Sequence, residues 1–130
     1  MTSESEALVQ SLVRLEAPRR GVRLWRNNVG VLRDEGGRPV RYGLANDSKR
    51  LNEELKSGDL IGWRRRLITP ADVGYIVAQF VSRECKPADW TPCGPGNVAL
   101  FAREEAQRRW AAIVNADGGD ACFVTGEGTL

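Results

Sequence analysis

Two segments with helical periodicity frame this chain, one near its start and one near its end. In Ser3–Ala17 and in Val98–Asn115, apolar residues recur at three- and four-residue spacing, which predicts two amphipathic helices. Ser3 followed by Glu6 fits a capping box, and Pro18 is expected to close the first helix. The apolar stripes are Leu8, Val9, Leu12, Val13 and Leu15 in the first helix, and Ala102, Ala106, Trp110 and Ile113 in the second, which ends at Asp117-Gly118-Gly119.

The segments between and after these helices are rich in branched and aromatic residues and are separated by turn residues. Asp34-Glu35-Gly36-Gly37 predicts the turn of a hairpin, and the polar segment 45–57 is expected to be a long, mobile connection. The predicted strands are 24–32, 40–42, 60–63 (short and buried), 74–84 and 121–125, with a loop over 86–97. The order αβββαβ predicts one α/β domain over residues 1–130, its core at about 6–125, with a mixed β-sheet flanked by helices.

The chain of 130 residues contains no histidine. This absence excludes Ser-His-Asp and Cys-His catalysis and imidazole-ligated zinc, and leaves carboxylates, amines, amides, hydroxyls, thiols, or a metal held by oxygen. The three cysteines form no CxxC pair, so neither a disulfide framework nor a structural zinc site is indicated. No apolar run approaches the ~20 residues of a membrane helix, and the acidic start is not a signal peptide. We therefore expect a cytoplasmic protein of a bacterial cell or a phage-infected host, without a membrane partner.

The small net charge of +2 conceals a basic middle segment. Residues 18–66 carry 13 Lys or Arg against 6 Asp or Glu, a net charge of 13 − 6 = +7. Most of these cations are arginines, whose guanidinium groups bind phosphate through two parallel hydrogen bonds. The segment therefore favours a nucleic acid partner. The alternative is compositional bias, since 16 Arg against 3 Lys is also what a GC-rich genome produces.

The residues with the most distinctive chemistry stand at the ends of two predicted strands. Asp59 precedes one strand, and Glu84-Cys85-Lys86 ends another. Because strand side chains alternate, Glu84 and Lys86 are expected on the same face. Two carboxylates on neighbouring strands, with the main-chain carbonyl of Cys85 between them, suit Mg²⁺ or Mn²⁺. The alternative is an ordinary salt bridge from Glu84 to Lys86 or to a nearby arginine.

Several ordered motifs resemble the VRR-NUC domain, a family of the PD-(D/E)XK nuclease superfamily, and in particular its free-standing phage and prophage members. The resemblance runs from about Glu6 to Thr125 and implies a restriction-endonuclease-like core. Segment 45–57 is longer than the link usual in that family and is an inserted charged loop in this comparison. The motifs are Arg26-Asn27-Asn28-Val29-Gly30, Tyr42-Gly43-Leu44, Ser57-Gly58-Asp59-Leu60-Ile61-Gly62, Glu84-Cys85-Lys86, Gln107 and Gly118-Gly119.

The resemblance implies that Asp59 and Glu84 bind the metal, that Lys86 is the catalytic lysine and that Gln107 is the glutamine of the following helix. Trp110, Ala111 and Val114 follow Gln107 by three, four and seven residues, so its amide is expected to face the sheet, where a core hydrogen bond is the alternative role.

Glu6 stands where the family places an acid on the first helix, in the outer shell of the ion. Its alternative role is the capping box, and Glu4 and Glu16 are the other candidates for that acid.

The expected function is that of a Mg²⁺- or Mn²⁺-dependent DNA endonuclease. Small members of the family resemble Holliday-junction resolvases, which implies a homodimer acting on branched DNA. Flap cleavage is the nearer alternative, and a non-catalytic, arginine-rich DNA-binding phage protein that keeps the fold is the more distant one. The residues expected to contact DNA are Arg26, Asn28, Arg64 and Arg65.

Overall fold

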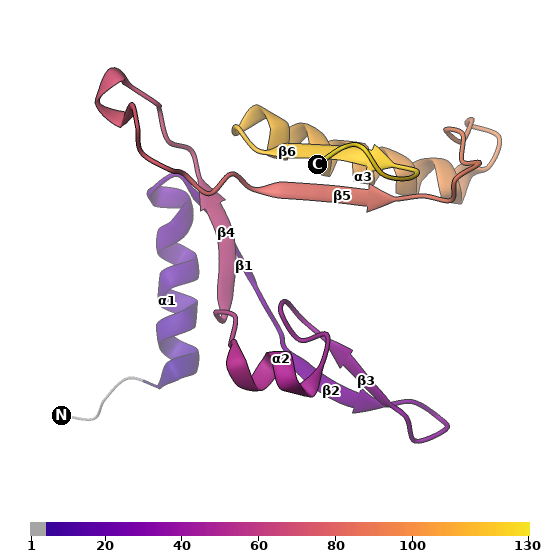
Figure 1. The fold of residues 1–130 in the computed structure, drawn as a ribbon, viewed down its shortest axis with the longest axis horizontal. Helices are drawn as coiled ribbons and strands as arrows, with labels where there is room; N and C mark the ends of the chain where they lie inside the picture. Colours follow the sequence, from indigo (N-terminus) through magenta and orange to yellow (C-terminus); the bar gives the residue numbers. More distant parts are fainter. Residues whose placement is uncertain (1–4) are drawn as a thin grey trace. The chain divides into compact units, whose positions relative to one another are not determined.

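The computed structural model describes residues 5–130 and has a mixed α/β fold. The chain divides into two compact units, Met1–Arg64 and Arg65–Leu130, which are described separately below. Within the described residues the strands form three two-stranded sheets, which pair β1 with β4, β2 with β3, and β5 with β6 (Figure 1).

Helix α1 (Glu6–Arg19) opens the first unit. Its N-cap is Ser5, whose hydroxyl accepts a hydrogen bond of 3.2 Å from the backbone N–H of Leu8. The predicted cap, Ser3, lies outside the described residues. Pro18 stands in the last turn, and the helix ends one residue after it, so the predicted helix is confirmed with a small shift of its end.

Strands β1 (Val22–Arg26) and β4 (Leu60–Arg64) pair antiparallel, with Val22 opposite Arg64 and Arg26 opposite Leu60. The strand predicted over 60–63 is confirmed, but it is half-buried rather than fully buried. Gly62 is required in this pair, because a Cβ atom there would collide with the backbone carbonyl of Arg23 on β1.

The single strand predicted over 24–32 is wrong. The chain leaves β1 after Arg26 and begins a separate strand, β2 (Gly30–Arg33), which forms a hairpin with β3 (Pro39–Tyr42). Residues 27–29 interrupt the strand because the Asn27 side chain bonds to segments distant in sequence, as described below. The predicted turn over 34–37 and the returning arm over 40–42 are confirmed.

Segment 45–57, which the sequence predicts to be a long, mobile connection, contains a short helix, α2 (Lys49–Glu54). The hydroxyl of Ser48 caps α2 by accepting the backbone N–H of Leu51 at 3.1 Å. The ion pairs Lys49–Glu53 and Arg50–Glu54 join successive turns. Six residues with few apolar positions give too little periodicity for sequence patterns to detect such a helix.

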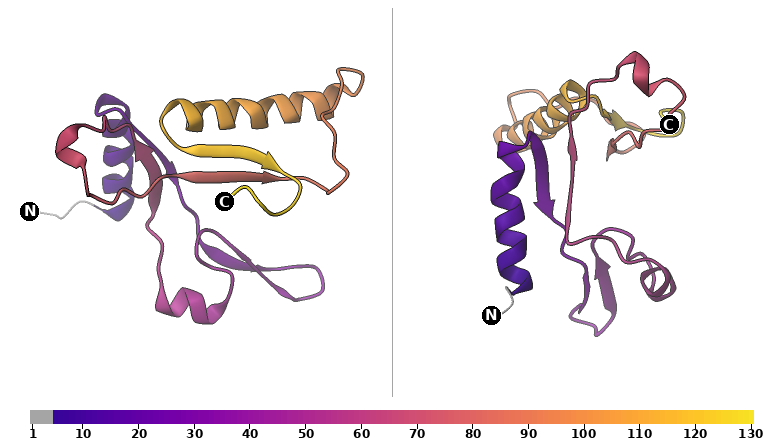
Figure 2. Two further views of the ribbon diagram at one scale, coloured as in Figure 1. Left: turned by 45° about the horizontal axis from the view of Figure 1, so that its top comes forward. Right: turned by 90° about the vertical axis from the view of Figure 1, so that its left-hand side faces the viewer.

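The second unit is built on two parallel strands, β5 (Val81–Cys85) and β6 (Asp120–Val124). Parallel neighbours need a crossover, and helix α3 (Val98–Ala116) makes it, running back alongside the strand pair (Figure 2). The predicted helix and the last strand are confirmed to within a residue, and 86–97 is a loop as expected.

The strand predicted over 74–84 is wrong for residues 74–80, which form no strand. Tyr75 and Ile76 are 74% and 99% exposed, so their strand-like composition is not accompanied by burial in a sheet. A 3-10 turn, η1 (Pro70–Asp72), precedes this segment. Thr69 and Asp72 form a capping box at the N-terminus of the turn.

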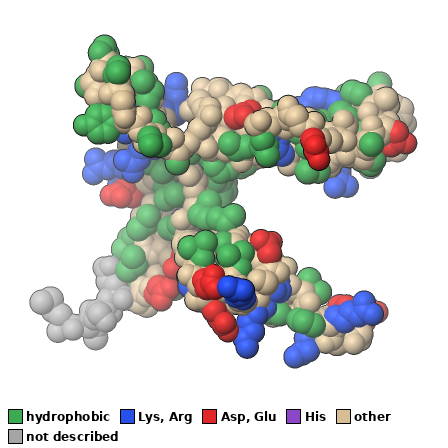
Figure 3. Space-filling model, viewed as in Figure 1, with side chains coloured by type: hydrophobic (Ala, Val, Ile, Leu, Met, Phe, Trp, Pro, Cys, Tyr) green, Lys and Arg blue, Asp and Glu red, His purple; other side chains and the backbone are tan. Residues whose placement is uncertain are grey.

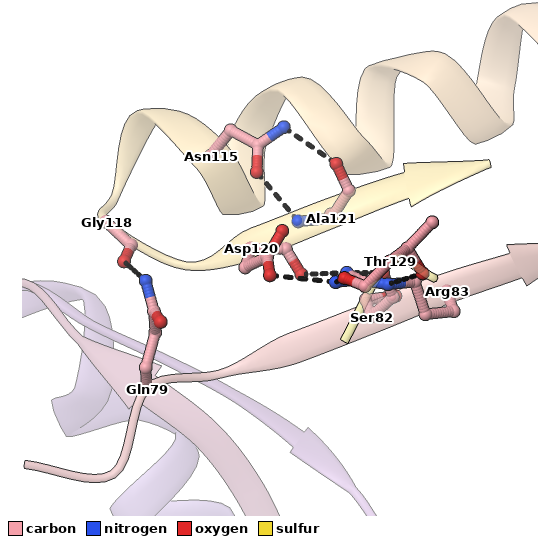
Figure 4. Close-up of polar contacts among 8 residues, drawn as sticks. All are labelled: Gln79, Ser82, Arg83, Asn115, Gly118, Asp120, Ala121 and Thr129. Carbon is pink, nitrogen blue, oxygen red and sulfur yellow. Dashed lines mark hydrogen bonds and ion pairs between the residues drawn. The ribbon is translucent and has the colours of Figure 1, made fainter. Parts of the chain in front are cut away.

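Polar side chains fasten the turn between α3 and β6 (Figure 4). The amide of Asn115 bonds both the N–H and the carbonyl of Ala121, at 2.8 and 2.9 Å. From β5, Arg83 reaches Asp120 at 2.8 Å and the carbonyl of Thr129 at 2.6 Å, which holds the C-terminal segment against the sheet. This charged hydrogen bond raises the pKa of Arg83 and lowers the pKa of Asp120. Gly119 is required here because a Cβ would lie 2.6 Å from Val114.

Few apolar residues are buried among those the structure describes: Ala17, Val114 and Ala121. Apolar side chains are visible over both units in Figure 3, and the predicted stripe of α1 is exposed, from 37% at Val13 to 68% at Leu15. On α3 the buried positions are Glu104 and Val114, whereas Trp110 and Ile113 of the predicted stripe are each 38% exposed. No helix within residues 5–130 has the length and apolar character needed to cross a membrane.

Asn46 is the buried polar group that holds the hairpin of the first unit, and it is 2% exposed. Its amide nitrogen donates to the carbonyls of Gly30 and Tyr42, at 2.9 and 2.8 Å, and so ties the start of β2 to the end of β3. Its amide oxygen accepts from the Arg41 guanidinium at 2.8 Å. The preceding Ala45 has φ of 56°, a left-handed conformation that turns Asn46 inward.

We expect Asn46→Ala to lower the free energy of unfolding by about 1–3 kcal/mol, because two carbonyls and one guanidinium lose their buried partner. Urea denaturation followed by circular dichroism measures the change. Asn52→Ala on α2, which removes an exposed bond to Lys56, is the matched control. Equal stability of the two variants would contradict the role given to Asn46.

Candidate active site

The residues predicted to form the site are divided between the two units. Asp59, Glu6, Arg26, Asn28 and Arg64 belong to the first unit. The second unit contains the remaining residues, which are Glu84, Cys85, Lys86, Gln107 and Arg65. The two groups are therefore described in turn.

Asp59 immediately precedes β4, with an exposed side chain. Its backbone carbonyl accepts a hydrogen bond of 2.8 Å from the N–H of Asn27, which extends the β1–β4 pairing by one residue. This bond fixes the backbone of Asp59 and leaves its carboxylate accessible to a ligand.

The side chain of Asn27 joins three segments around Asp59. Its amide nitrogen donates to the hydroxyl of Ser57 at 2.7 Å and to the carbonyl of Gly58 at 2.9 Å. Its amide oxygen accepts the N–H of Leu44 at 3.2 Å, and the Ser57 hydroxyl donates to the carbonyl of Leu44 at 2.7 Å. Sequence analysis did not assign Asn27 a role, although it lies in a motif; here it positions the residues just before Asp59.

The glycines of the other motifs permit close approaches in the same unit. A Cβ at Gly30 would collide with the ring hydroxyl of Tyr42. Gly43 has φ of 94°, and a Cβ there would lie 2.5 Å from the carbonyl of Asn28 and 2.6 Å from Val29. The motif residues of the first unit therefore contact one another: Gly30 lies against Tyr42, and Gly43 lies against Asn28 and Val29.

In the second unit, Gln107 bridges Glu84 and Lys86. Its amide nitrogen donates to Glu84 Oε1 at 2.8 Å, and its amide oxygen accepts from Lys86 Nζ at 2.8 Å. The direct distance between Lys86 Nζ and Glu84 Oε1 is 3.9 Å, so the amide, rather than a close salt bridge, links the charges. The predictions that Glu84 and Lys86 share a face and that Gln107 faces the sheet are confirmed.

Glu84 and Lys86 differ in their access to solvent. The side chain of Glu84 is 40% exposed, whereas that of Lys86 is 10% exposed. The Lys86 ammonium lies 5.5 Å from the ring centre of Phe123 and 5.8 Å from that of Trp90. The carboxylate is therefore open to a ligand, and the amine beside it is held among aromatic rings.

The carboxylate of Glu104 is a buried group that sequence analysis did not single out. Glu104 is 1% exposed, and its oxygens accept the indole N–H of Trp90 and the backbone N–H of Cys93, each at 2.9 Å. The Arg108 guanidinium lies 3.6 Å from Glu104 Oε2. The available signal was helical spacing, since Glu104 precedes Gln107 by three residues and Val114 by ten, on the same face of α3.

These contacts act on the pKa of Glu104. The bonds from the Cys93 N–H and then the Trp90 indole lower the pKa below its ordinary value of 4.5, and burial opposes them. The positive charges of Lys86 and Arg108 lower it further. The second unit therefore keeps an ionised carboxylate in its interior.

The oxygens near Glu84 are of the type that Mg²⁺ and Mn²⁺ prefer. Gln107 occupies Glu84 Oε1, which leaves Oε2 for a cation, and the main-chain carbonyl of Cys85 follows directly. Within residues 5–130, no group of three or more Cys, Asp or Glu side chains is arranged to hold a metal ion. The predicted ligand set has two carboxylates and one carbonyl, of which the second unit carries Glu84 and the Cys85 carbonyl.

A pocket of about 290 Å³ adjoins Glu84 between α3 and the β5–β6 pair. Glu84 and Gln107 line one part of it, and Arg103, Trp110 and Phe123 line others. The indole of Trp110 donates to the hydroxyl of Ser82 on β5 at 2.9 Å. The predicted carboxylate thus stands at the wall of a concave surface that carries both aromatic and charged groups.

The remaining predicted residues lie at exposed positions. Glu6 is the first residue of α1, Glu16 stands near its end, and Glu4 lies outside the described residues. Arg26, Asn28 and Arg64 are exposed in the first unit. Arg65 forms an ion pair of 3.4 Å with Asp117, so one of the predicted DNA contacts has a partner within its own unit.

The lowered pKa of Glu104 predicts a pH-dependent contribution to stability. A carboxyl whose pKa is depressed by folding stabilises the protein above its unfolded pKa, and the effect is lost as pH falls through the folded value. We expect the difference in unfolding free energy between wild type and Glu104→Gln to be constant above about pH 4.5 and to shrink below it. Urea denaturation at several pH values measures it.

Glu105→Gln is the matched control for the loss of one charge on α3, since the Glu105 side chain is 41% exposed. If the two differences follow pH in the same way, the buried hydrogen bonds of Glu104 are not the cause.

Comparisons with protein-family models, with curated proteins and with solved structures found no match to this chain.

Proposed function

We propose that this chain is a Mg²⁺- or Mn²⁺-dependent endonuclease that hydrolyses DNA phosphodiester bonds, with the VRR-NUC-like site that its motifs suggest. The observation that carries the proposal is the Glu84–Gln107–Lys86 hydrogen-bond chain of the second unit. An exposed carboxylate can hold a metal ion, and an amine beside it can stabilise negative charge that develops on a phosphate.

Glu84, Asp59 and the Cys85 carbonyl would hold the ion in this proposal. Bound there, Mg²⁺ or Mn²⁺ would activate the attacking water and offset charge on the phosphate. The Lys86 ammonium has three N–H donors and donates one to Gln107, so the others can bind a phosphate oxygen or orient a water. Gln107 orients both Glu84 and Lys86, and Glu6 is the proposed outer acid.

Asp59 precedes β4 and Glu84 ends β5. The proposal includes the finer fold expected from the sequence, a restriction-endonuclease-like core. What supports this fold is local: in the first unit, Asn27 bonds the backbone carbonyls of Gly58 and Asp59.

The proposed substrate is branched DNA, with a four-way junction preferred and a homodimer as the acting species. Two symmetric cuts need two sites related by a two-fold axis. The basic segment 18–66 supports DNA as the polyanion, and Arg26, Asn28, Arg64 and Arg65 are the proposed contacts. Action in the cytoplasm of a bacterial or phage-infected cell belongs to the same proposal.

We expect the wild type to cleave a synthetic four-way junction in Mg²⁺ or Mn²⁺ and to be inactive in EDTA. Asp59→Asn and Glu84→Gln keep the shape of each side chain but remove its charge, so each should reduce cleavage at least about 100-fold. Gel analysis of labelled junctions, with linear duplex and flap DNA in parallel, measures rate and preference.

Glu53→Gln on α2 is the control, because it removes one exposed carboxylate outside the proposed site. If Asp59→Asn and wild type behave identically across both metal titrations, the nuclease proposal is wrong. Metal-independent binding without cleavage would instead favour the arginine-rich DNA-binding protein.

The proposed DNA contacts predict a salt-dependent affinity. Each phosphate contact releases counterions and contributes a slope of about −0.9 in log K against log salt. We expect Arg64→Ala to reduce the slope by roughly one such contact, whereas Arg109→Ala, at an exposed position on α3 outside the basic segment, should leave it unchanged. Fluorescence anisotropy over a salt series measures both, and a flat dependence for the wild type would argue against phosphate binding.

A further inference from the structure

The environment of Lys86 is unusual for a residue that has just left a strand. β5 ends at Cys85, and Lys86 begins a loop that contains three prolines, over 86–97. Yet its side chain is only 10% exposed, with the ammonium 5.8 Å from the Trp90 ring centre and 5.5 Å from that of Phe123. The two rings approach one another at 5.2 Å in an edge-to-face arrangement.

The two rings have different supports. Phe123 lies on β6, opposite Glu84 in the parallel pair, so the sheet fixes it. Trp90 belongs to the loop and depends on the buried Glu104, which accepts its indole N–H at 2.9 Å. The same carboxylate accepts the N–H of Cys93 at 2.9 Å and so ties the loop to α3 at a second point.

We propose that Trp90, fixed by Glu104, is a positioning residue that holds the Lys86 ammonium against Gln107 and beside Glu84. This inference rests on the proposed nuclease function for its catalytic consequence. A lysine side chain has four rotatable methylene groups and no rigid fork, so a single hydrogen bond to Gln107 leaves it other orientations. The two adjoining rings attract the cation and favour the orientation in which it lies against them.

The geometry of this assembly has a direct spectroscopic test. The chain has three lysines, Lys49, Lys56 and Lys86, and the first two are exposed on and after α2. In protein labelled with ¹³C at the lysine ε-carbon, ring currents should shift the Lys86 ε-proton signal upfield of the other two. Lys86→Met assigns the signal by its disappearance.

Trp90→Leu should move the Lys86 signal toward the position of the exposed lysines. Trp25→Leu, which removes a tryptophan 42% exposed in the first unit, should leave it in place. Glu104→Gln should have an intermediate effect, because each Glu104 oxygen accepts one of the two N–H groups and the NH2 that replaces one of these oxygens cannot accept. A Lys86 signal that coincides with the exposed lysines in the wild type, or that ignores Trp90→Leu, would overturn the positioning by Trp90.

The catalytic consequence is tested with the wild type and the same variants on a four-way junction with Mn²⁺. Misplacing the amine should lower kcat on the order of 10- to 100-fold in Trp90→Leu, with KM unchanged within about twofold. Trp90→Phe, which keeps an aromatic face but loses the indole N–H that Glu104 accepts, should recover only part of the rate. Thermal unfolding of each variant identifies any loss of rate that comes from misfolding.

The outcomes separate this inference from the proposed function. If Lys86→Met abolishes cleavage but Trp90→Leu retains the full kcat, the nuclease proposal stands and the positioning role is wrong. If Trp90→Leu and Trp90→Phe lose rate equally, the aromatic face is not what matters and the inference is again wrong. A wild type that cleaves no DNA contradicts the proposed function and the catalytic part of the inference, and the NMR shifts alone then decide the position of Lys86.

Discussion

The parallel pairing of β5 with β6 is the constraint on which the second unit depends. Two parallel neighbours force the chain to return along the full length of the strands, and α3 is that return. The helix therefore lies along both strands and carries Gln107 and Glu104 to β5 and the loop after it. A hairpin between the same strands would need no helix, and Glu84 and Lys86 would have no amide between them.

Polar side chains, more than apolar ones, determine the local structure of both units. Asn27 and Asn46 join segments of the first unit through amide bonds to backbone groups. Glu104 and Asn115 do the same around α3. A buried amide or carboxylate has directional partners, and losing one of them costs more than losing a dispersion contact. These bonds therefore specify particular backbone paths where few apolar side chains are fully buried.

Long elements with a strong local pattern were predicted from the sequence, whereas segments whose structure depends on distant contacts were not. The long helix 98–116 and the hairpin turn 34–37 were predictable, because nineteen periodic residues and a Gly-Gly turn are strong local signals. The interruption of the first strand at Asn27 was not, since its cause is bonding to Leu44, Ser57 and Gly58. Similarly, β-branched residues over 74–80 gave the composition of a strand, but no strand forms there.

The sequence by itself determined which chemistry is available: without histidine, imidazole catalysis and imidazole ligation of a metal are excluded, and Glu84 and Lys86 must share a face because strand side chains alternate. It also placed Gln107 toward the sheet through helical spacing. Only the tertiary structure decided that Gln107 links the two charges, that Lys86 lies beside Trp90 and Phe123, and that Glu104 is buried. The physical reason is the distance in sequence between contacting residues. Periodicity indicates which way a side chain points within its own helix or strand, but the residues that it contacts come from distant segments that only folding brings together.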